Sequence, residues 1–313
     1  MTALPSKLAS SRSKTTTSDD VVQIAGVRLT HPDRVLYPDQ GITKRELALY
    51  YQQIADWIMP HIKNRPLTLV RCPAGYKRQC FYQRHTRDSL DKAIHSIPIK
   101  EGQSTASYLY IDSLSGLIAL VQMGVLELHT WGSRKERLEQ PDRLIFDLDP
   151  DPSVSWKKLQ DAAHSLRTLL SDLGLGAFVK TTGGKGLHVV VPIAPKQDWD
   201  FAKEFSKSVA HSMVRGAPDR YTATMSKSKR KGKIFIDYLR NTRTATAVCA
   251  YSSRARAGAP VSVPLRWEEL AEDVRSQFTI RNVPERLARL RQDPWQDYEA
   301  TRATLTRAML QKF

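Results

Sequence analysis

Apolar residues are spaced along this chain in two ways that alternate without a fixed order. Short apolar runs bounded by turn residues predict β-strands, and apolar residues every three to four positions predict amphipathic helices. The predicted strands lie at 67–71, 80–84, 107–111 and 143–149, on both sides of the turn in 177–193, and at 233–239. A hairpin is predicted before them, in 21–38.

The clearest predicted helix runs from about 43 to 63, where Thr43 and Glu46 have the spacing of a capping box. A second helix of about twenty residues begins near Ser155, with its apolar residues on one face. Further helices are expected at 113–124 and around 200–214, and the tail from 266 is expected to be mostly helical. Because strands and helices mix without strict alternation, the sequence predicts an α+β fold of two sheets with helices packed outside, and no Rossmann fold.

The chain is predicted to have one folded domain. Residues 1–20 are rich in Ser, Thr and Lys and are expected to form a disordered leader or interdomain linker, with the domain at 21–313. No apolar run approaches the roughly 20 residues of a membrane-spanning helix, and the N-terminus lacks an export signal core. A cytoplasmic protein without a membrane partner is expected.

Charge and cysteine content narrow the class of protein. The formal net charge is +16 and the pI about 9.8, which favours a polyanionic partner, nucleic acid first and anionic membrane second. The cysteines are Cys72, Cys80 and Cys249, odd in number and without C-x-x-C spacing. We therefore expect a reducing compartment, with neither a disulfide framework nor a zinc ribbon.

Acidic residues interrupt two of the apolar strands. In "RLIFDLDPDP", Asp147 and Asp149 alternate with Leu148 and so point to one face of the strand. Asp237 ends the apolar run of "KIFIDYL". A single such acid is usually a turn or cap residue, but the three together favour a site for Mg²⁺ or Mn²⁺, which prefer carboxylate oxygens. Two such ions support phosphoryl transfer.

Several basic segments are compatible with phosphate binding. "KTTGGKGLHVVV" is not a Walker loop, yet its glycines allow a turn whose N–H groups face an anion, with Lys185 and His188 nearby; a plain hairpin turn is the alternative. His129 is either a ligand or a satisfied core histidine. Arg254 and Arg256 either bind phosphate or are loop charges. The basic loop "SKSKRKGK" at 226–233 is either a solvated loop or a nucleic-acid contact.

The N-terminal part offers two further candidates. Arg34 precedes a turn and Lys44 lies in the first turn of a capped helix, an arrangement that suits a terminal phosphate. Phe81 and Tyr82 either stack on a base or are buried strand aromatics.

These motifs resemble a known family. "DLDP", "TTGGKGLH" and "IDYLRN" resemble, in order and spacing, the three motifs of the archaeo-eukaryotic primase superfamily. "RVLYP", "MPHI" and "ELHTWGSR" narrow the resemblance to the polymerase domain of bacterial ATP-dependent DNA ligase D, over roughly 25 to 300. The resemblance implies the primase-polymerase fold, with two β-sheets forming a central cleft. The zinc-binding set of many primases is missing, which favours end repair over de novo priming.

The resemblance also implies an activity: addition of nucleotides, preferably ribonucleotides with Mn²⁺, to DNA 3′ ends and gaps during non-homologous end joining. It implies linked ligase and phosphoesterase domains and a Ku-type end-binding partner. It assigns the metals to Asp147, Asp149 and Asp237 and the incoming nucleotide to His129, Thr182, Lys185, His188 and Arg254. It assigns the 5′-phosphate of the DNA to Arg34 and Lys44, and template stacking to Phe81.

Two other classes of protein use parts of this pattern. A metal-dependent nuclease needs the same carboxylates but no triphosphate cradle. A non-catalytic module that binds DNA ends does not need acids at strand ends, where they are unfavourable without a cation.

Overall fold

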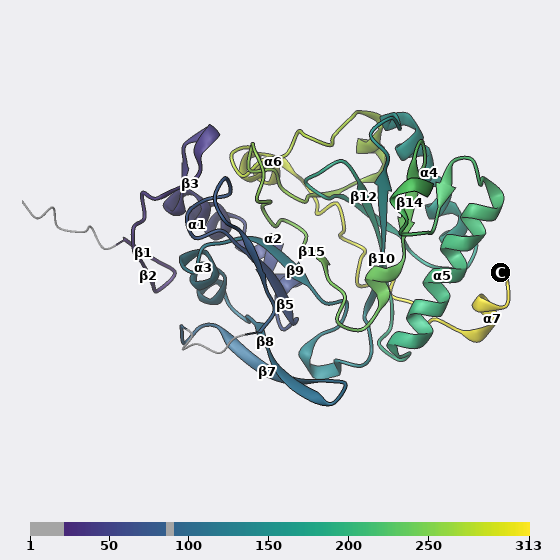
Figure 1. The fold of residues 1–313 in the computed structure, drawn as a ribbon, viewed down its shortest axis with the longest axis horizontal. Coiled ribbons are helices and arrows are strands. Elements are labelled where there is room, and N and C mark those ends of the chain that lie inside the picture. Colours follow the sequence, from purple (N-terminus) through teal and green to yellow (C-terminus); the bar gives the residue numbers. More distant parts are fainter. Residues whose placement is uncertain (1–21, 86–90) are drawn as a thin grey trace, which may run out of the picture.

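Two β-sheets organise the molecule, whose computed structural model describes residues 22–85 and 91–313 (Figure 1). The predicted leader therefore lies outside the described residues. The larger sheet has the order β13 (Tyr221–Thr222), β14 (Ile234–Asp237), β10 (Arg143–Pro150), β12 (Leu187–Pro192), β11 (Phe178–Thr181) and β16 (Pro264–Leu265). The smaller has the order β15 (Ala247–Val248), β9 (Val125–Thr130), β5 (Leu67–Arg71) and β6 (Phe81–Gln83).

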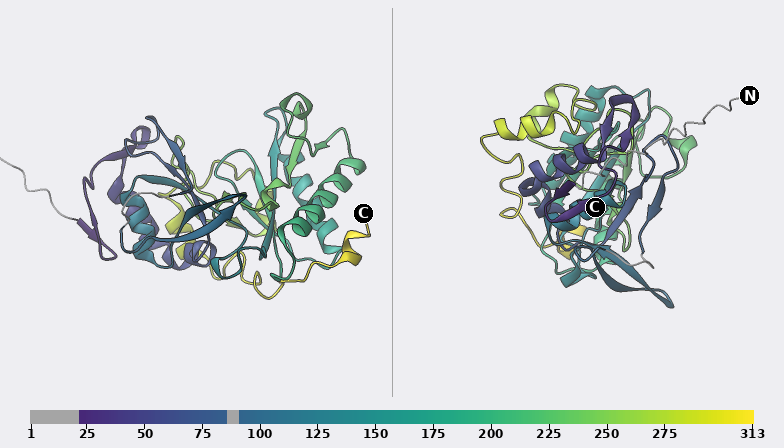
Figure 2. Two further views of the ribbon diagram at one scale, coloured as in Figure 1. Left: turned by 60° about the horizontal axis from the view of Figure 1, so that its bottom comes forward. Right: turned by 90° about the vertical axis from the view of Figure 1, so that its left-hand side faces the viewer.

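Helices lie on the outside of both sheets, as expected for an α+β fold (Figures 1 and 2). The larger sheet is covered by α4 (Trp156–Ser171) and α5 (Trp199–Gly216), and the smaller by α1 (Lys44–Gln53), α2 (Ala55–Ile62) and α3 (Leu114–Gln122). Three two-stranded ribbons complete the strands: β1 (Val22–Ile24) with β2 (Val27–Leu29), β3 (Val35–Tyr37) with β4 (Ile42–Thr43), and β7 (His95–Glu101) with β8 (Ser104–Tyr110).

Strand β10 has two chemically different faces. Leu144, Phe146 and Leu148 are fully buried and belong to the main core cluster, which includes the apolar faces of α4 and α5. The alternate residues, among them Asp147 and Asp149, point to the opposite face, toward the smaller sheet. The predicted alternation is confirmed, and it places both acids between the sheets.

Local signals predicted where helices begin better than where they end. The capping box of Thr43 and Glu46 is present, and α4 begins next to Ser155 as expected, with the Ser155 side chain as its N-cap. The helix predicted over 43–63 is interrupted at Ile54, whose φ of −107° and ψ of 18° separate α1 from α2. The expectation of a mostly helical tail was wrong: beyond 266 the chain forms short turns, α6 (Val283–Arg289) and α7 (Arg307–Leu310). This tail packs against the larger sheet, where the indole N–H of Trp295 donates to the carbonyl of Val179.

The expectation that the cysteines form no disulfide was also wrong. Cys72 and Cys80 are joined, with their Cα atoms 4.4 Å apart, while Cys249 is free and buried. The spacing of the two residues did not predict this pairing. It forms because the turn between them, in which Gly75 has a φ of +92°, brings the chain back beside β5. In the described part of the chain no helix is long and apolar enough to cross a membrane.

A buried ion pair links the residues just before β5 of the smaller sheet to those just before β10 of the larger sheet. Arg65, just before β5, donates two hydrogen bonds of 2.7 Å to Asp142, just before β10, and both side chains are almost fully buried. Burial alone would raise the pKa of Asp142, but the charge of Arg65 outweighs it and the pKa is lowered. The pair therefore fixes the distance between the first residues of β5 and the first residues of β10.

Asp142→Asn should lower the free energy of unfolding by about 3–5 kcal/mol, because it leaves the Arg65 charge buried without a partner. Urea unfolding at pH 7 measures this. The double variant Arg65→Met/Asp142→Leu should recover much of the loss, since a well-packed apolar pair replaces the ions. Asp33→Asn, which breaks the exposed pair with Arg45, is the control. A loss no larger than that of the control would contradict the role given to this pair.

Candidate active site

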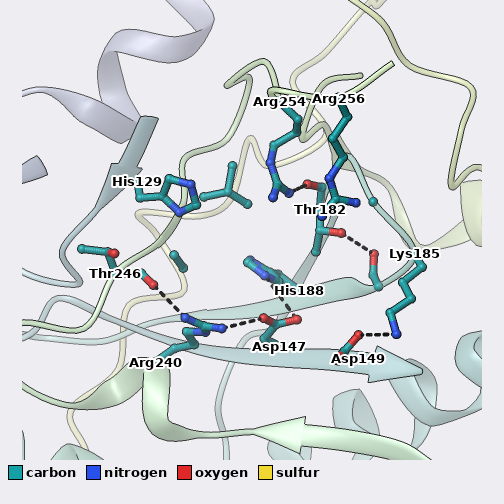
Figure 3. Close-up of a pocket in the computed structure, with 14 residues that line it drawn as sticks. His129, Asp147, Asp149, Thr182, Lys185, His188, Arg240, Thr246, Arg254 and Arg256 are labelled. Carbon is teal, nitrogen blue, oxygen red and sulfur yellow. Dashed lines mark hydrogen bonds and ion pairs between the residues drawn. The ribbon is translucent and has the colours of Figure 1, made fainter. Parts of the chain in front are cut away.

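A cavity of about 380 Å³ lies between the two sheets (Figure 3). Its walls come from β9, β10, the turn between β11 and β12, the segment around β15 and the loop that follows it. It is lined by His129, Asp147, Asp149, Thr182, Gly184, Lys185, Gly186, His188, Arg240, Thr246, Ala247, Val248, Arg254 and Arg256. Eight of the residues proposed from the sequence are thus brought together, from segments far apart in the chain.

The strand register sets the relative positions of the acidic residues. Asp147 on β10 pairs with Asp237 on β14 and, on its other side, with His188 on β12. Residues directly opposite in an antiparallel pair point to the same face and lie within about 5.5 Å. Asp147 therefore stands between a second carboxylate and an imidazole, with Asp149 two residues further along the same face.

Arginine, lysine and histidine side chains lie close to these carboxylates. Asp147 lies 3.5 Å from His188 Nε2 and 3.5 Å from a terminal nitrogen of Arg240. Asp149 lies 3.1 Å from Lys185 Nζ, and Asp237 lies 3.1 Å from Arg240 Nε.

These contacts shift the pKa values in opposite directions. Burial would raise the pKa of Asp147, but His188 and Arg240 lower it to about 2. Burial and the adjacent Asp147 raise the pKa of Asp237, against the opposing charge of Arg240. The adjacent carboxylates therefore differ in how readily they lose a proton, as expected for interacting acids held close together.

Asp147, Asp149 and Asp237 all offer carboxylate oxygens, which are the ligands that a hard divalent cation prefers. Among residues 22–85 and 91–313, however, no three His, Cys, Asp or Glu side chains are grouped so that they could hold a metal ion. The oxygens instead contact Arg240, Lys185 and His188. A bound cation would have to replace at least the contacts of Arg240, which touches both Asp147 and Asp237.

The glycine-rich segment is the hairpin turn between β11 and β12, and it is pressed closely against its neighbours. Gly183 has a φ of +64°, and a Cβ there would lie 2.7 Å from Arg254 Cγ. A Cβ on Gly186 would lie 2.5 Å from the backbone oxygen of Leu148. Within the described residues, the backbone N–H groups of Gly183, Gly184 and Lys185 donate to no protein acceptor. The turn thus presents unused donors beside the cavity, as an anion cradle requires.

Glu127 on β9 is a site residue that the sequence analysis missed. Its carboxylate accepts a hydrogen bond of 2.9 Å from His129 Nε2, lies 3.1 Å from Arg254 Nε and accepts one of 2.9 Å from the N–H of Ala255. Burial would raise its pKa, but His129 and Arg254 lower it to about 2. One buried acid therefore positions two candidate nucleotide ligands. The signal was present in "LELH", where Glu127 and His129 share a strand face.

Lys180 on β11 was also missed. It is fully enclosed, pairs with His188 in the strand register, and donates hydrogen bonds to the carbonyl of Val248 at 3.0 Å and to Ser262 Oγ at 2.6 Å. Burial lowers its pKa to about 7. Since Val248 belongs to β15 of the smaller sheet, Lys180 ties the two sheets together beneath the cavity.

The remaining candidates lie outside this cavity. Lys44 is buried at the start of α1, and its ammonium donates to the carbonyl of Thr30 at 2.8 Å and lies 3.3 Å from Gln122 Oε1. Arg34 is exposed, and its backbone carbonyl accepts from the N–H of Lys44. Burial and the charge of Arg34 lower the pKa of Lys44. The acceptors of the Lys44 ammonium, in Thr30 and Gln122, are uncharged, so within the described residues no carboxylate neutralises Lys44.

Phe81 lies on the edge strand β6. Its exposed fraction is 42%, that of Tyr82 is 74%, and the guanidinium of Arg71 lies 5.3 Å from the Phe81 ring centre. The alternative of a buried strand aromatic is wrong for both residues, because β6 lies at the edge of the described sheet, paired with β5.

Comparison with known proteins places these features in a family. Residues 43–295 match the model of the LigD primase-polymerase domain. The multifunctional non-homologous end joining protein LigD of Pseudomonas aeruginosa is 42% identical over 287 residues, which cover 91% of this chain and 34% of that protein. The protein of the same name from Mycolicibacterium smegmatis is 36% identical over 263 residues, covering 83% and 34%.

A solved structure supports the same conclusion. The polymerase domain from Mycobacterium tuberculosis ligase D in complex with DNA matches with a TM-score of 0.83 and 33% identity, over 88% of this chain and 98% of that one. The resemblance and the primase-polymerase fold predicted from the sequence are thereby confirmed. This chain spans about a third of the length of the curated relatives it matches.

Glu127→Gln should lower the free energy of unfolding at pH 7, and the difference from the wild type should narrow as the pH falls. The pKa of the carboxyl in the folded protein lies below its ordinary value of 4.5. The ionised form therefore contributes stability above pH 4.5, and this contribution is lost as the pH falls toward about 2. Urea unfolding of both proteins at pH 7, 5.5, 4 and 3 measures the difference.

The control is Glu285→Gln, which removes an exposed ion pair with Arg289 and should change stability little. A difference between wild type and Glu127→Gln that stays constant over this pH range would show that the carboxylate of Glu127 is not held by its charged neighbours.

Proposed function

Because this chain belongs to the family of LigD primase-polymerase domains, we propose that it extends and fills DNA ends during non-homologous end joining. It is a nucleotidyltransferase domain that adds nucleotides to DNA, with a nucleoside triphosphate as substrate and a divalent metal as cofactor. The 3′-hydroxyl of the DNA loses its proton to solvent and its oxygen forms a bond to the α-phosphorus, while the bond from the α-phosphorus to the oxygen that bridges to the β-phosphate breaks. Pyrophosphate leaves with the electron pair.

The observation that carries this proposal is the meeting of two kinds of group in one cavity. Asp147 and Asp149 lie on its floor, and the turn 182–186, Arg254 and Arg256 lie on the other side (Figure 3). A nuclease has use for the carboxylates, but not for a turn with unused N–H donors and two arginines facing them. A non-catalytic end-binding module needs neither.

Asp147, Asp149 and Asp237 would hold the divalent ions, Mg²⁺ or Mn²⁺. Asp147 and Asp149 would bind both ions, and Asp237 would bind the catalytic ion only. When bound, two such ions activate the attacking oxygen and stabilise the charge on the leaving phosphate. Arg240 contacts Asp147 and Asp237, so it would move aside and become free to contact phosphate. Lys185, which contacts Asp149, would turn in the same way toward the triphosphate.

The chain's own residues would orient the nucleotide. Lys185, Arg254 and the turn N–H groups would bind the triphosphate, with Thr182 and His188 at its inner end. His129 lies on the opposite side of the cavity, where its ring can contact the ribose (Figure 3). Its pKa is lowered by burial despite Glu127, so the ring is neutral near pH 7 and can exchange a hydrogen bond with a 2′-hydroxyl. This arrangement supports the use of ribonucleotides.

Arg34 and Lys44 would grip the 5′-phosphate of a gap or break. The first N–H groups of α1 are bonded within the protein, so the positive end of the helix dipole and the two positive charges would favour a phosphate there. Phe81, exposed beside Arg71, would stack on the template base. The partners we propose are gapped or broken DNA, ligase and phosphoesterase domains in a longer polypeptide, and a Ku-type protein. The site of action is the bacterial nucleoid in the cytoplasm.

Asp147→Asn should lower nucleotide incorporation by at least about a hundredfold, because it removes the carboxylate shared by both ions. The assay is extension of a labelled primer on a template with Mn²⁺ and each nucleoside triphosphate, with the melting temperature checked in parallel. Asp151→Asn is the control, since its carboxylate binds Ser153 outside the cavity. Extension by the wild type identifies a polymerase, shortening a nuclease, and no change a binding module. Near-normal extension by Asp147→Asn would overturn the metal assignment.

Arg34→Ala should reduce the preference for a 5′-phosphorylated gap over a 5′-hydroxyl gap by about tenfold to a hundredfold, the value of one hydrogen bond to a charged group. Binding of the two gapped duplexes, followed by fluorescence anisotropy, measures the preference. Arg291→Ala, an exposed arginine beyond α6, is the control. If the wild type binds both gaps equally well, the phosphate site lies elsewhere.

A further inference from the structure

A separate cavity, of about 310 Å³, lies at the start of β10. Its walls come from the end of α2, the segments just before β5 and just after β9, the start of β10 and the C-terminal tail. We call it the arginine cavity, and it is lined by Pro60, His61, Arg65, Arg134, Arg143, Asp293, Trp295, Gln296, Tyr298 and Glu299.

The arginine cavity shares no lining residue with the proposed nucleotide cavity around Asp147. Arg143 and Asp147 are four residues apart on β10, so they share a face and lie about 13 Å apart along the strand. Between them on the same face is Ile145, which packs in a cluster with Val190, Ala247 and Trp295. This cluster separates the two cavities, because Ala247 lines one and Trp295 lines the other.

Positive charge exceeds negative charge among the buried groups of the arginine cavity. Asp142 pairs with Arg65 at 2.7 Å and lies 3.5 Å from Arg134 Nε, so one carboxylate serves two guanidinium groups. Arg143 is only 6% exposed, yet in the described part of the chain no carboxylate lies within 4.0 Å of it. Burial and the charge of Arg65 lower the pKa of Arg143 to about 10. Three guanidinium groups and one carboxylate leave two positive charges without a partner.

The two acids that line the cavity do not supply the missing partner. Glu299 pairs with Arg302, and its side chain is 68% exposed. Asp293 accepts a hydrogen bond of 2.8 Å from the N–H of Trp295, and burial raises its pKa. Among the residues that the structure describes, neither acid lies within 4.0 Å of the three arginines.

Several hydrogen-bond donors of the cavity are unused. Arg143 donates only through Nη2, to Thr130 Oγ1 and to the carbonyl of Trp131. Its Nε and Nη1, the Nε of Arg65 and the Tyr298 hydroxyl donate to no acceptor within residues 22–85 and 91–313. Buried donors without acceptors are rare in folded proteins, and a buried cation without a partner is unfavourable. Together these groups indicate a ligand that carries negative charge and accepts hydrogen bonds.

We propose that the arginine cavity binds the dianionic phosphate group of inorganic phosphate or of a small phosphate monoester. Two uncompensated positive charges match a dianion better than a single carboxylate. The planar guanidinium group matches the geometry of a phosphate, and the arginines come from different segments, so they can meet a tetrahedral anion from different sides.

The other walls leave room for the organic part of an ester. The rings of Trp295 and Tyr298 are stacked with their centres 5.3 Å apart, and the His61 ring centre lies 5.4 Å from that of Trp295. Burial and the nearby arginines lower the pKa of His61 to about 3, so this ring is neutral at pH 7. The volume is at the lower end of the range of about 300–1,000 Å³ that is typical of small-molecule sites.

Isothermal titration calorimetry of the full chain at pH 8, with inorganic phosphate and separately with phenyl phosphate, tests this site. In Arg143→Met the affinity of one phosphate site should fall at least about tenfold, because donors to a charged ligand are lost. Arg254→Ala is the matched control, because its guanidinium lines the nucleotide cavity, and the affinity of this phosphate site should be retained. Tighter binding of phenyl phosphate would assign the site to an ester, and tighter binding of inorganic phosphate to the free ion.

Melting temperatures separate a ligand site from a purely structural arginine. Phosphate should raise the melting temperature of the wild type but not that of Arg143→Met, since a ligand stabilises only the protein that binds it. Arg143→Lys keeps the positive charge and decides the question if Arg143→Met does not fold; its affinity should also fall about tenfold, because an ammonium lacks the guanidinium fork. Equal stabilisation of the wild type and the folded Arg143 variant, or an affinity lost only in Arg254→Ala, would overturn the proposal.

Discussion

The register of β10 between β14 and β12 is the constraint on which the site depends. It sets Asp147 opposite Asp237 on one side and opposite His188 on the other. Carboxylates held this close repel each other unless positive charge lies between them. In the structure that charge comes from Arg240 and Lys185, while burial lowers the pKa of the neighbouring His188 to about 4. The three carboxylates are the ligands we propose for metal ions, and the neighbouring basic side chains suit phosphates, so one electrostatic requirement would explain both sets of residues.

The cavity belongs to neither sheet alone, so the contacts that join the sheets also shape it. Glu127 on the smaller sheet positions Arg254, whose guanidinium donates to the carbonyl of Thr182 at the hairpin turn of the larger sheet. Lys180 makes the reverse connection, from the larger sheet to Val248. Changes at these buried residues are therefore expected to alter nucleotide binding together with stability.

Much of this site could be predicted from the sequence, because its strongest signals are local. Alternation along a strand placed Asp147 and Asp149 on one face, and three motifs in order identified the family. Glu127 and Lys180 were missed because the role of an ionisable residue in an apolar strand depends on partners that lie far away in the sequence. Lys180 contacts Ser262, 82 residues away. The disulfide of Cys72 and Cys80 and the irregular tail likewise depend on how the chain returns to its core, which local patterns do not encode.

The central claim is that Asp147, Asp149 and Asp237 form a divalent-metal site that is completed by a nucleotide. Electron paramagnetic resonance of Mn²⁺, titrated into the wild-type chain with and without a non-hydrolysable nucleoside triphosphate, tests it most directly. The account predicts two bound ions per chain in the presence of the nucleotide, tighter binding than in its absence, and loss of both ions in Asp147→Asn. Mn²⁺ binding that is absent from the wild type, or unchanged in that variant, would contradict it.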